Sequence, residues 1–136
     1  MEKLNLKLLE KLGRYTHRIR KGVACKLQFG TKISEITNFV KKKIFEKGYL
    51  PAFPCSVCVN NFAAHYTPFD KEYEFKKGEV VKIDFGISHK GFITDNVFTV
   101  EIGSDKYDKL LKANLEALNL QIEKIDCGVE MWELGK

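Results

Sequence analysis

Two aspartates, Asp84 and Asp95, have side chains and a spacing suited to metal chemistry. They lie in two segments rich in β-branched and aromatic residues, and the turn sequence at residues 88–91 lies midway between them. A short loop there joins the segments into a hairpin that pairs residues whose numbers sum to about 179. This pairing predicts that Asp84 lies directly opposite Asp95, with the two Cβ atoms roughly 5 Å apart.

Two carboxylates at that separation repel each other by about 3 kcal/mol at an effective dielectric constant near 20. The hairpin then needs either a proton held on one carboxyl group or a cation between the two. Two such carboxylates can bridge two divalent ions about 3.5–4 Å apart, as in hydrolases that activate water. The alternative is a β-bulge that shifts the register by one residue and turns the side chains to opposite faces. The spacing favours the cation over the proton and leaves the bulge open.

His65 is the candidate proton donor. It lies in a polar and aromatic stretch, residues 60–68, that ends at a proline. A histidine in such a stretch either makes a hydrogen bond within its loop or polarises a carbonyl group near a metal centre. The other two histidines, His17 and His89, are expected to be exposed, His89 at the tip of the hairpin.

Four cysteines are present, and Cys55 and Cys58 have the C-x-x-C spacing of zinc and redox sites. A structural zinc site needs a second ligand pair, and Cys25 and Cys127 are isolated from each other. A redox motif opens a helix after a strand, whereas this motif follows two prolines. We expect reduced thiols without a zinc or redox role.

Apolar periodicity predicts the elements that must position these residues. One helix is expected over residues 3–25, with Leu4, Leu8, Leu12, Tyr15 and Ile19 on one face. A second begins after a cap at Thr31 and ends at Gly48. An edge or irregular strand is expected over residues 52–60, and the two strands of the hairpin over 80–87 and 92–102. A third helix is expected after a cap at Ser104, and a fourth is expected to start after Gly128. This order predicts an α+β fold with an antiparallel hairpin at its centre.

The composition narrows the function classes. The chain has 136 residues, 44% hydrophobic and 30% charged, which is typical of a globular protein of about one domain. Its first twenty residues alternate charges with leucines and contain no apolar run, which predicts neither a signal peptide nor a membrane helix and favours the cytoplasm. Residues 1–50 carry a net charge of +9 and the rest −4. The basic stretch, Lys41–Lys43 included, is either the solvated face of a helix or a surface for nucleic acid or the ribosome.

Four segments resemble those of type 2 methionine aminopeptidases, the archaeal and eukaryotic class. They are Pro51–Pro54, Asn60–Pro68, Lys77–Gly86 and Gly91–Val100. The resemblance covers essentially the whole chain and implies the pita-bread fold, in which two pseudo-symmetric α+β halves close over a dinuclear metal site. Residues 1–136 would then be the N-terminal half of the catalytic domain, with helices packed on a curved antiparallel sheet and an end within a helix.

Carried over by position, the resemblance implies that Asp84 and Asp95 are metal ligands, with Asp95 bridging the two metals. His65 would contact the scissile amide and the bound substrate, and Phe53 would line the pocket for the methionine side chain. The implied reaction removes the N-terminal methionine of a nascent protein. Either Co, Mn, Fe or Zn could serve as the two divalent ions, because such ligands discriminate poorly among them.

The family's remaining metal ligands come from its second half, so we expect this chain to be inactive until a separate or adjoining C-terminal half completes the site. Departures from the family pattern are Phe29-Gly30 in place of Pro-Gly, and the residues at 54–58. The competing hypothesis is a non-catalytic nucleic-acid- or ribosome-binding protein on the same fold. Prolidase-like dipeptidases share the paired aspartates but differ in the flanking motifs.

Overall fold

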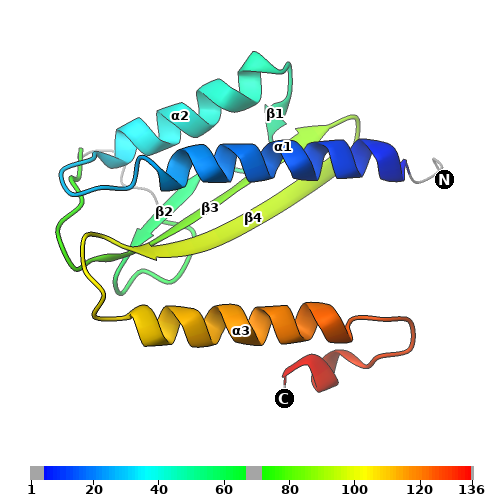
Figure 1. Ribbon diagram of the computed structural model, residues 1–136. Coiled ribbons are helices and arrows are strands. Elements are labelled where there is room, and N and C mark those ends of the chain that lie inside the picture. The colour runs from blue at the N-terminus through cyan, green and yellow to red at the C-terminus, as the bar shows by residue number, and fades with distance from the viewer. Residues whose placement is uncertain (1–4, 67–71, 136) are drawn as a thin grey trace. The chain divides into compact units, whose positions relative to one another are not determined.

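The computed structural model describes residues 5–66 and 72–135. Its elements are α1 (Leu6–Ala24), α2 (Ile33–Glu46), β1 (Leu50–Pro51), β2 (Ser56–Val59), β3 (Val80–His89), β4 (Phe92–Glu101), α3 (Asp108–Lys124) and the 3₁₀-helix η1 (Met131–Gly135) (Figure 1). They fall into two compact units, the first ending at Ser104 and the second beginning at Asp105. Leu4, expected on the face of the first helix, and Thr67 and Pro68, expected in the stretch around His65, lie outside the described residues. The α+β class is confirmed.

The sheet of the first unit is built around β3. Its partner β4 runs antiparallel along the whole of one edge, from Val80 opposite Glu101 to His89 opposite Phe92. The other edge is shared by two short antiparallel strands, β1 at residues 87–88 and β2 at residues 81–84. The single strand expected over residues 52–60 is therefore interrupted. Pro54, which has no backbone N–H to donate to a ladder, lies in the break between β1 and β2.

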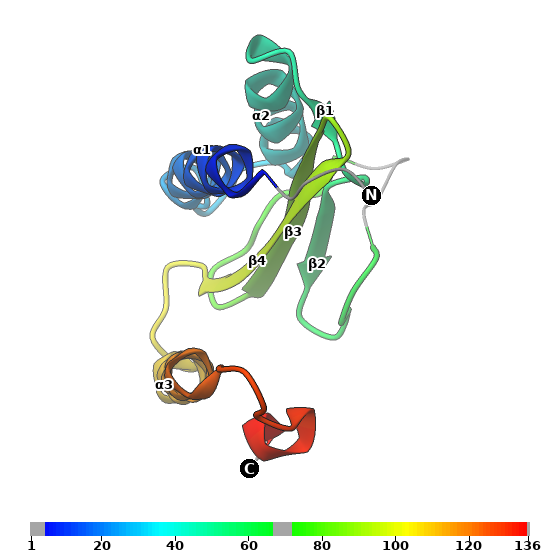
Figure 2. The ribbon, with the colours of Figure 1, turned by 90° about the vertical axis from the view of Figure 1, so that its right-hand side faces the viewer.

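The two faces of the sheet differ in burial. Alternate residues of β3 (Val81, Ile83, Phe85 and Ile87) are buried in one cluster with side chains of α1 and α2. Both helices therefore cover the same face of the sheet (Figure 2). Since side chains alternate along a strand, Lys82, Asp84, Gly86 and Ser88 belong to the opposite face. We call this opposite face of β3, with its neighbours on β2 and β4, the open face.

The first helix packs through a stripe of Leu12, Thr16, Ile19 and Val23, all buried. The apolar spacing predicted Leu12 and Ile19 correctly. It missed Thr16, a polar residue that is only 2% exposed, because the expected stripe passed through Tyr15 instead.

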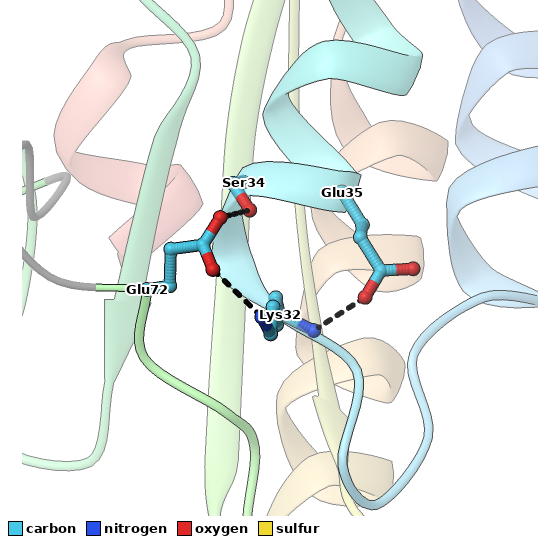
Figure 3. Close-up of polar contacts among 4 residues, drawn as sticks. All are labelled: Lys32, Ser34, Glu35 and Glu72. Atoms are coloured by element: carbon cyan, nitrogen blue, oxygen red, sulfur yellow. Dashed lines mark hydrogen bonds and ion pairs between the residues drawn. The ribbon is translucent and has the colours of Figure 1, made fainter.

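The second helix begins one residue later than expected, after Lys32. The Lys32 backbone N–H donates to Glu35 Oε1 (3.1 Å), and the Lys32 ammonium group forms an ion pair with Glu72 (2.7 Å). Ser34 Oγ also donates to Glu72, at 3.3 Å (Figure 3). The contacts of Lys32 and Ser34 with Glu72 are exposed and join the start of the helix to the segment that leads into β3. The predicted end at Gly48 is confirmed, because the helix closes at Glu46 and Gly48 has a φ of +68°.

In the second unit, α3 begins at Asp108 after Tyr107, so the expected cap at Ser104 is wrong. Residues 105–108 instead form a turn in which Asp108 N–H donates to the Asp105 carbonyl (3.1 Å). The segment after Gly128 forms the 3₁₀-helix η1 rather than the start of an α-helix. No helix within residues 5–66 and 72–135 has the length and apolarity needed to cross a membrane.

Candidate metal centre

The turn of the hairpin fixes where the two aspartates lie. It is a two-residue loop of Lys90 and Gly91, with φ of +50° and +78°. Two consecutive positive φ angles are the signature of the type I′ turn, whose twist matches that of the strands it joins. This loop lies one residue later than the centre predicted from the sequence. The pairing of Asp84 directly opposite Asp95 is therefore wrong: Asp84 lies opposite Val97, and Asp95 opposite Gly86.

The corrected register still keeps both carboxyl groups together. A shift of one residue on each strand leaves the side-chain alternation unchanged, so Asp84 and Asp95 remain on the open face as diagonal neighbours. Diagonal neighbours lie roughly 7–8 Å apart, within reach of side chains of this length. The alternative of a bulge that turns them to opposite faces is also wrong.

Asp84 has an unusual electrostatic setting. Burial is the main cause that raises the pKa of its carboxyl group, followed by the negative charge of Asp95, and a hydrogen bond between the two groups adds to the rise. The nearby charges of His65 and Lys82 oppose it. Asp84 Oδ1 is buried and has no hydrogen-bond partner among the described residues. A buried oxygen left in this state costs about 1–3 kcal/mol, which a bound cation would offset.

The neighbouring strand β2 adds polar groups beside Asp84. Ser56 lies directly opposite Asp84 and is 8% exposed. Cys55, the residue before it, has a thiol whose pKa rises to about 12, chiefly because it is buried and further because of the Asp84 charge. Neither Cys55 nor Cys58 forms a disulfide, and both lie on an extended segment, a setting unlike the helix start of a redox motif.

His65 reaches this site through a loop that folds back on β2. The Tyr66 carbonyl accepts from Val57 N–H (2.9 Å), and the rings of Phe62 and Tyr66 stack at 4.1 Å. His65 itself has a φ of +54°, a left-handed conformation that few residues other than glycine adopt. Its side chain is exposed and close enough to Asp84 to influence its pKa. Of the predicted site residues, the structure therefore brings His65 near Asp84.

The other histidines stand apart from this site. His17 is exposed, as expected. The expectation for His89 is wrong in part: its ring lies 4.7 Å from that of Tyr49, and the side chain is half-buried. Tyr49 follows α2 and lies beside the hairpin tip, so its aromatic ring partly shields His89 from solvent.

Phe53 also lies at the open face. A Cβ atom placed on Gly86 would stand 2.8 Å from Cε1 of Phe53 and 3.1 Å from Cβ of Ala52, so both side chains pack over the bare backbone of Gly86. Ile93 and Val97, which flank Asp95 along β4, are 58% and 49% exposed on the same face. The two carboxyl groups are therefore bordered by apolar side chains.

This arrangement can supply oxygen ligands to a divalent cation. The residues fit such an ion, since two neighbouring carboxyl groups carry an unpartnered buried oxygen. Within the part of the chain that the structure describes, no group of three or more His, Cys, Asp or Glu side chains is placed to hold a metal. The described residues thus offer two carboxyl groups and no complete set of metal ligands.

Sequence reasoning missed two residues at this site, Gly86 and Ser56, and one buried polar residue on the helix-covered side of the sheet, Thr16. Gly86 lies two residues after Asp84, and a glycine within a strand was the available signal that another group packs closely against the backbone there. The position of Ser56 beside Asp84 depends on the pairing of β2 with β3, which local sequence patterns do not predict. Thr16 showed itself only as a polar residue at a core position of the first helix.

Comparisons with known proteins show which family this chain resembles. Residues 7–136 match the model of metallopeptidase family M24. A methionine aminopeptidase of Thermococcus onnurineus is 38% identical over 129 residues, which cover 94% of this chain and 43% of that protein. A methionine aminopeptidase of Archaeoglobus fulgidus is 42% identical over 112 residues, covering 82% and 38%. The chain spans less than half the length of these relatives.

Solved structures share the fold. A methionine aminopeptidase from Thermotoga maritima superposes with a TM-score of 0.84 at 23% identity, covering 91% of this chain and 53% of that one. A prolidase from Pyrococcus horikoshii gives 0.81 at 22% identity, covering 95% and 38%. The expected half of a pita-bread fold is confirmed. With two carboxyl groups aligned on the open face and a family match over nearly all of its length, the chain belongs to metallopeptidase family M24.

Proposed function

We propose that this chain contributes one half of a methionyl aminopeptidase, which removes the N-terminal methionine from nascent proteins. The observation that carries the proposal is the pair Asp84 and Asp95, held side by side on the open face with a buried oxygen that lacks a partner among the described residues. Relatives named methionine aminopeptidase, 33–42% identical, support this choice among the activities that the fold can host.

Asp84 and Asp95 would hold two divalent ions, Co, Mn, Fe or Zn, since carboxylate oxygens select weakly among these metals. When bound, such ions supply an acidified water molecule and a Lewis acid for peptide hydrolysis. The described residues offer two carboxyl groups rather than a full ligand set. We therefore propose that the other ligands come from a C-terminal half of the catalytic domain, for which residues 1–136 are the N-terminal half.

The residues around the aspartates would bind the substrate. His65, which is exposed and near Asp84, would donate a hydrogen bond to the scissile amide of the bound substrate. The apolar border of the site suits an uncharged side chain such as methionine. Phe53 would form one wall of this pocket, because its ring already packs over Gly86 next to the carboxyl groups.

The proposed partners follow from this activity. The substrates are N-terminal methionyl peptides, and since such peptides emerge where proteins are made, the activity would be cytoplasmic. The basic residues 1–50, with a net charge of +9, would favour contact with the ribosome. The same charge is the observation that favours the competing function of a non-catalytic nucleic-acid-binding protein, which predicts RNA retention that weakens with salt and disappears when Lys41–Lys43 are neutralised.

The test is complementation. The chain is mixed with the C-terminal half of the Archaeoglobus fulgidus relative in manganese, and release of methionine from a methionyl tripeptide is measured. We expect hydrolysis from the mixture and from neither half alone. Asp84→Asn should abolish it, while Glu10→Gln, which removes a carboxylate from an exposed ion pair on α1, should preserve it. A mixture that stays inactive over the full range of metals would overturn the proposal.

A further inference from the structure

Thr94 has contacts that link the metal centre to the first helix. Its hydroxyl group lies 2.7 Å from Thr16 Oγ1, on α1, and accepts from the Ile87 backbone N–H at 3.1 Å. Thr94 immediately precedes Asp95 on β4. Because side chains alternate along a strand, the Thr94 hydroxyl points to the helix-covered face while the Asp95 carboxyl group points to the open face.

The protons in this group have one consistent arrangement. A hydroxyl group donates one hydrogen bond, and Thr16 Oγ1 donates its proton to the Leu12 carbonyl at 3.0 Å. Thr94 must then donate to Thr16, which leaves the lone pairs of Thr94 Oγ1 free to accept from Ile87. The result is a directed chain of hydrogen bonds from the Ile87 N–H through both hydroxyl groups to α1. Each bond in such a chain polarises the next, and the end of the chain at Thr16 is shielded from water because Thr16 is 2% exposed.

The carbonyl group of Thr94 is confined as well. A Cβ atom on Gly86, the residue opposite Asp95, would stand 2.2 Å from the Thr94 carbonyl oxygen. That oxygen therefore occupies space that any side chain at position 86 would need. The peptide bond between Thr94 and Asp95 is thus held by the hydroxyl chain on one side and by the backbone of Gly86 on the other.

We propose that Thr94 is a positioning residue: its hydroxyl chain to Thr16, together with Gly86, fixes the Thr94–Asp95 peptide and so directs the Asp95 carboxyl group toward Asp84. Thr94 would touch neither metal nor substrate. The inference rests on the proposed function, since it assumes that the two aspartates hold a divalent ion. Residues that orient a ligand from behind typically change metal affinity by about 10–100-fold when they are removed.

The experiment measures manganese affinity by isothermal titration calorimetry and the exchange rate of the Ile87 amide by NMR, on the whole 136-residue chain. Thr94→Val keeps the shape and removes the hydroxyl group, while Thr94→Ser keeps the hydroxyl group. We expect Thr94→Val to weaken manganese binding about tenfold and to speed exchange at Ile87. Thr94→Ser should restore both. Thr37→Val, which removes a similar hydroxyl bond to Ser34 on α2, is the matched control and should change neither.

The outcomes separate this inference from the proposed function. Unchanged manganese affinity in Thr94→Val overturns the positioning role, and an unchanged Ile87 exchange rate overturns the hydroxyl chain. If Asp84→Asn binds manganese as well as the wild type does, the metal site itself is wrong and the inference falls with it. Thermal melts verify that each variant folds. If Thr94→Val does not fold, Thr16→Val breaks the same chain of hydrogen bonds at α1. Unchanged manganese affinity in Thr16→Val would also overturn the positioning role.

Discussion

The backbone at Gly86 gives the sharpest stability prediction, the cost of adding one methyl group. In Gly86→Ala the new Cβ atom would stand 2.2 Å from the Thr94 carbonyl oxygen, 2.8 Å from Phe53 Cε1 and 3.1 Å from Ala52 Cβ. Ordinary contacts between such atoms are about 3.5–4.0 Å. The first clash is with the backbone of a strand and cannot be relieved by a change of rotamer, so β3 and β4 must separate locally.

Overpacking of a well-filled site costs about 1–3 kcal/mol, and a clash with backbone belongs at the upper end of that range. We expect Gly86→Ala to lose about 3 kcal/mol. At roughly 4 °C for each kcal/mol in a chain of this size, the melting temperature should fall by about 12 °C.

The matched control is Gly13→Ala. Gly13 lies in the middle of α1, and a Cβ atom there meets nothing within 4 Å. Replacing glycine by alanine in a helix gains about 0.5–1 kcal/mol, so this variant should melt about 2–4 °C higher. Both are measured by circular dichroism at 222 nm. A Gly86→Ala chain that melts within 2 °C of the wild type, on the ~4 °C per kcal/mol scale, would refute the packing argument and with it the proposed confinement of the Thr94 carbonyl.

Three further predictions concern charged groups. Burial and the charge of Asp95 raise the pKa of Asp84 above its usual 3.8. The folded chain therefore loses stability as the pH rises from 3.8 through the raised pKa. Metal-free Asp84→Asn should melt at a higher temperature than the wild type at pH 7, and this gain should shrink toward pH 4. Glu79 accepts from Tyr73 Oη and from the Lys76 N–H (2.8 Å). The hydrogen bond to Glu79, burial and the Glu79 charge raise the pKa of Tyr73 to about 12, so Glu79→Gln should lower the pKa of one tyrosine in an ultraviolet titration. Glu72→Gln removes the exposed ion pair with Lys32 and should leave the melting temperature unchanged, since such pairs are screened by solvent.

The parts of the fold set by local patterns were predictable from the sequence. The helix spanning Leu6–Ala24, the helix end at Gly48 and the hairpin strands follow from apolar spacing, glycine and β-branched residues. The common face of Asp84 and Asp95 was also predictable, because alternation along a strand survives a shift of one residue on each partner. Local strand geometry is therefore enough to bring the two carboxyl groups to one face of the sheet.

What the sequence left open depends on contacts between distant segments. The exact register followed from positive φ angles at Lys90 and Gly91, and the expected loop was centred one residue too early. The pairing of Ser56 with Asp84 joins residues 28 positions apart. The hydroxyl pair of Thr16 and Thr94 joins residues 78 positions apart, and no local periodicity encodes it.

The central claim is that Asp84 and Asp95 together hold divalent metal. X-ray diffraction at the manganese absorption edge, from crystals of this chain grown in manganese chloride, tests it most directly because anomalous scattering locates the ion itself. We expect an anomalous peak in contact with carboxyl oxygens of both Asp84 and Asp95, on the open face of the hairpin, and no such peak in Asp84→Asn. Manganese bound elsewhere, with these two carboxyl groups bare at saturating metal, would contradict it.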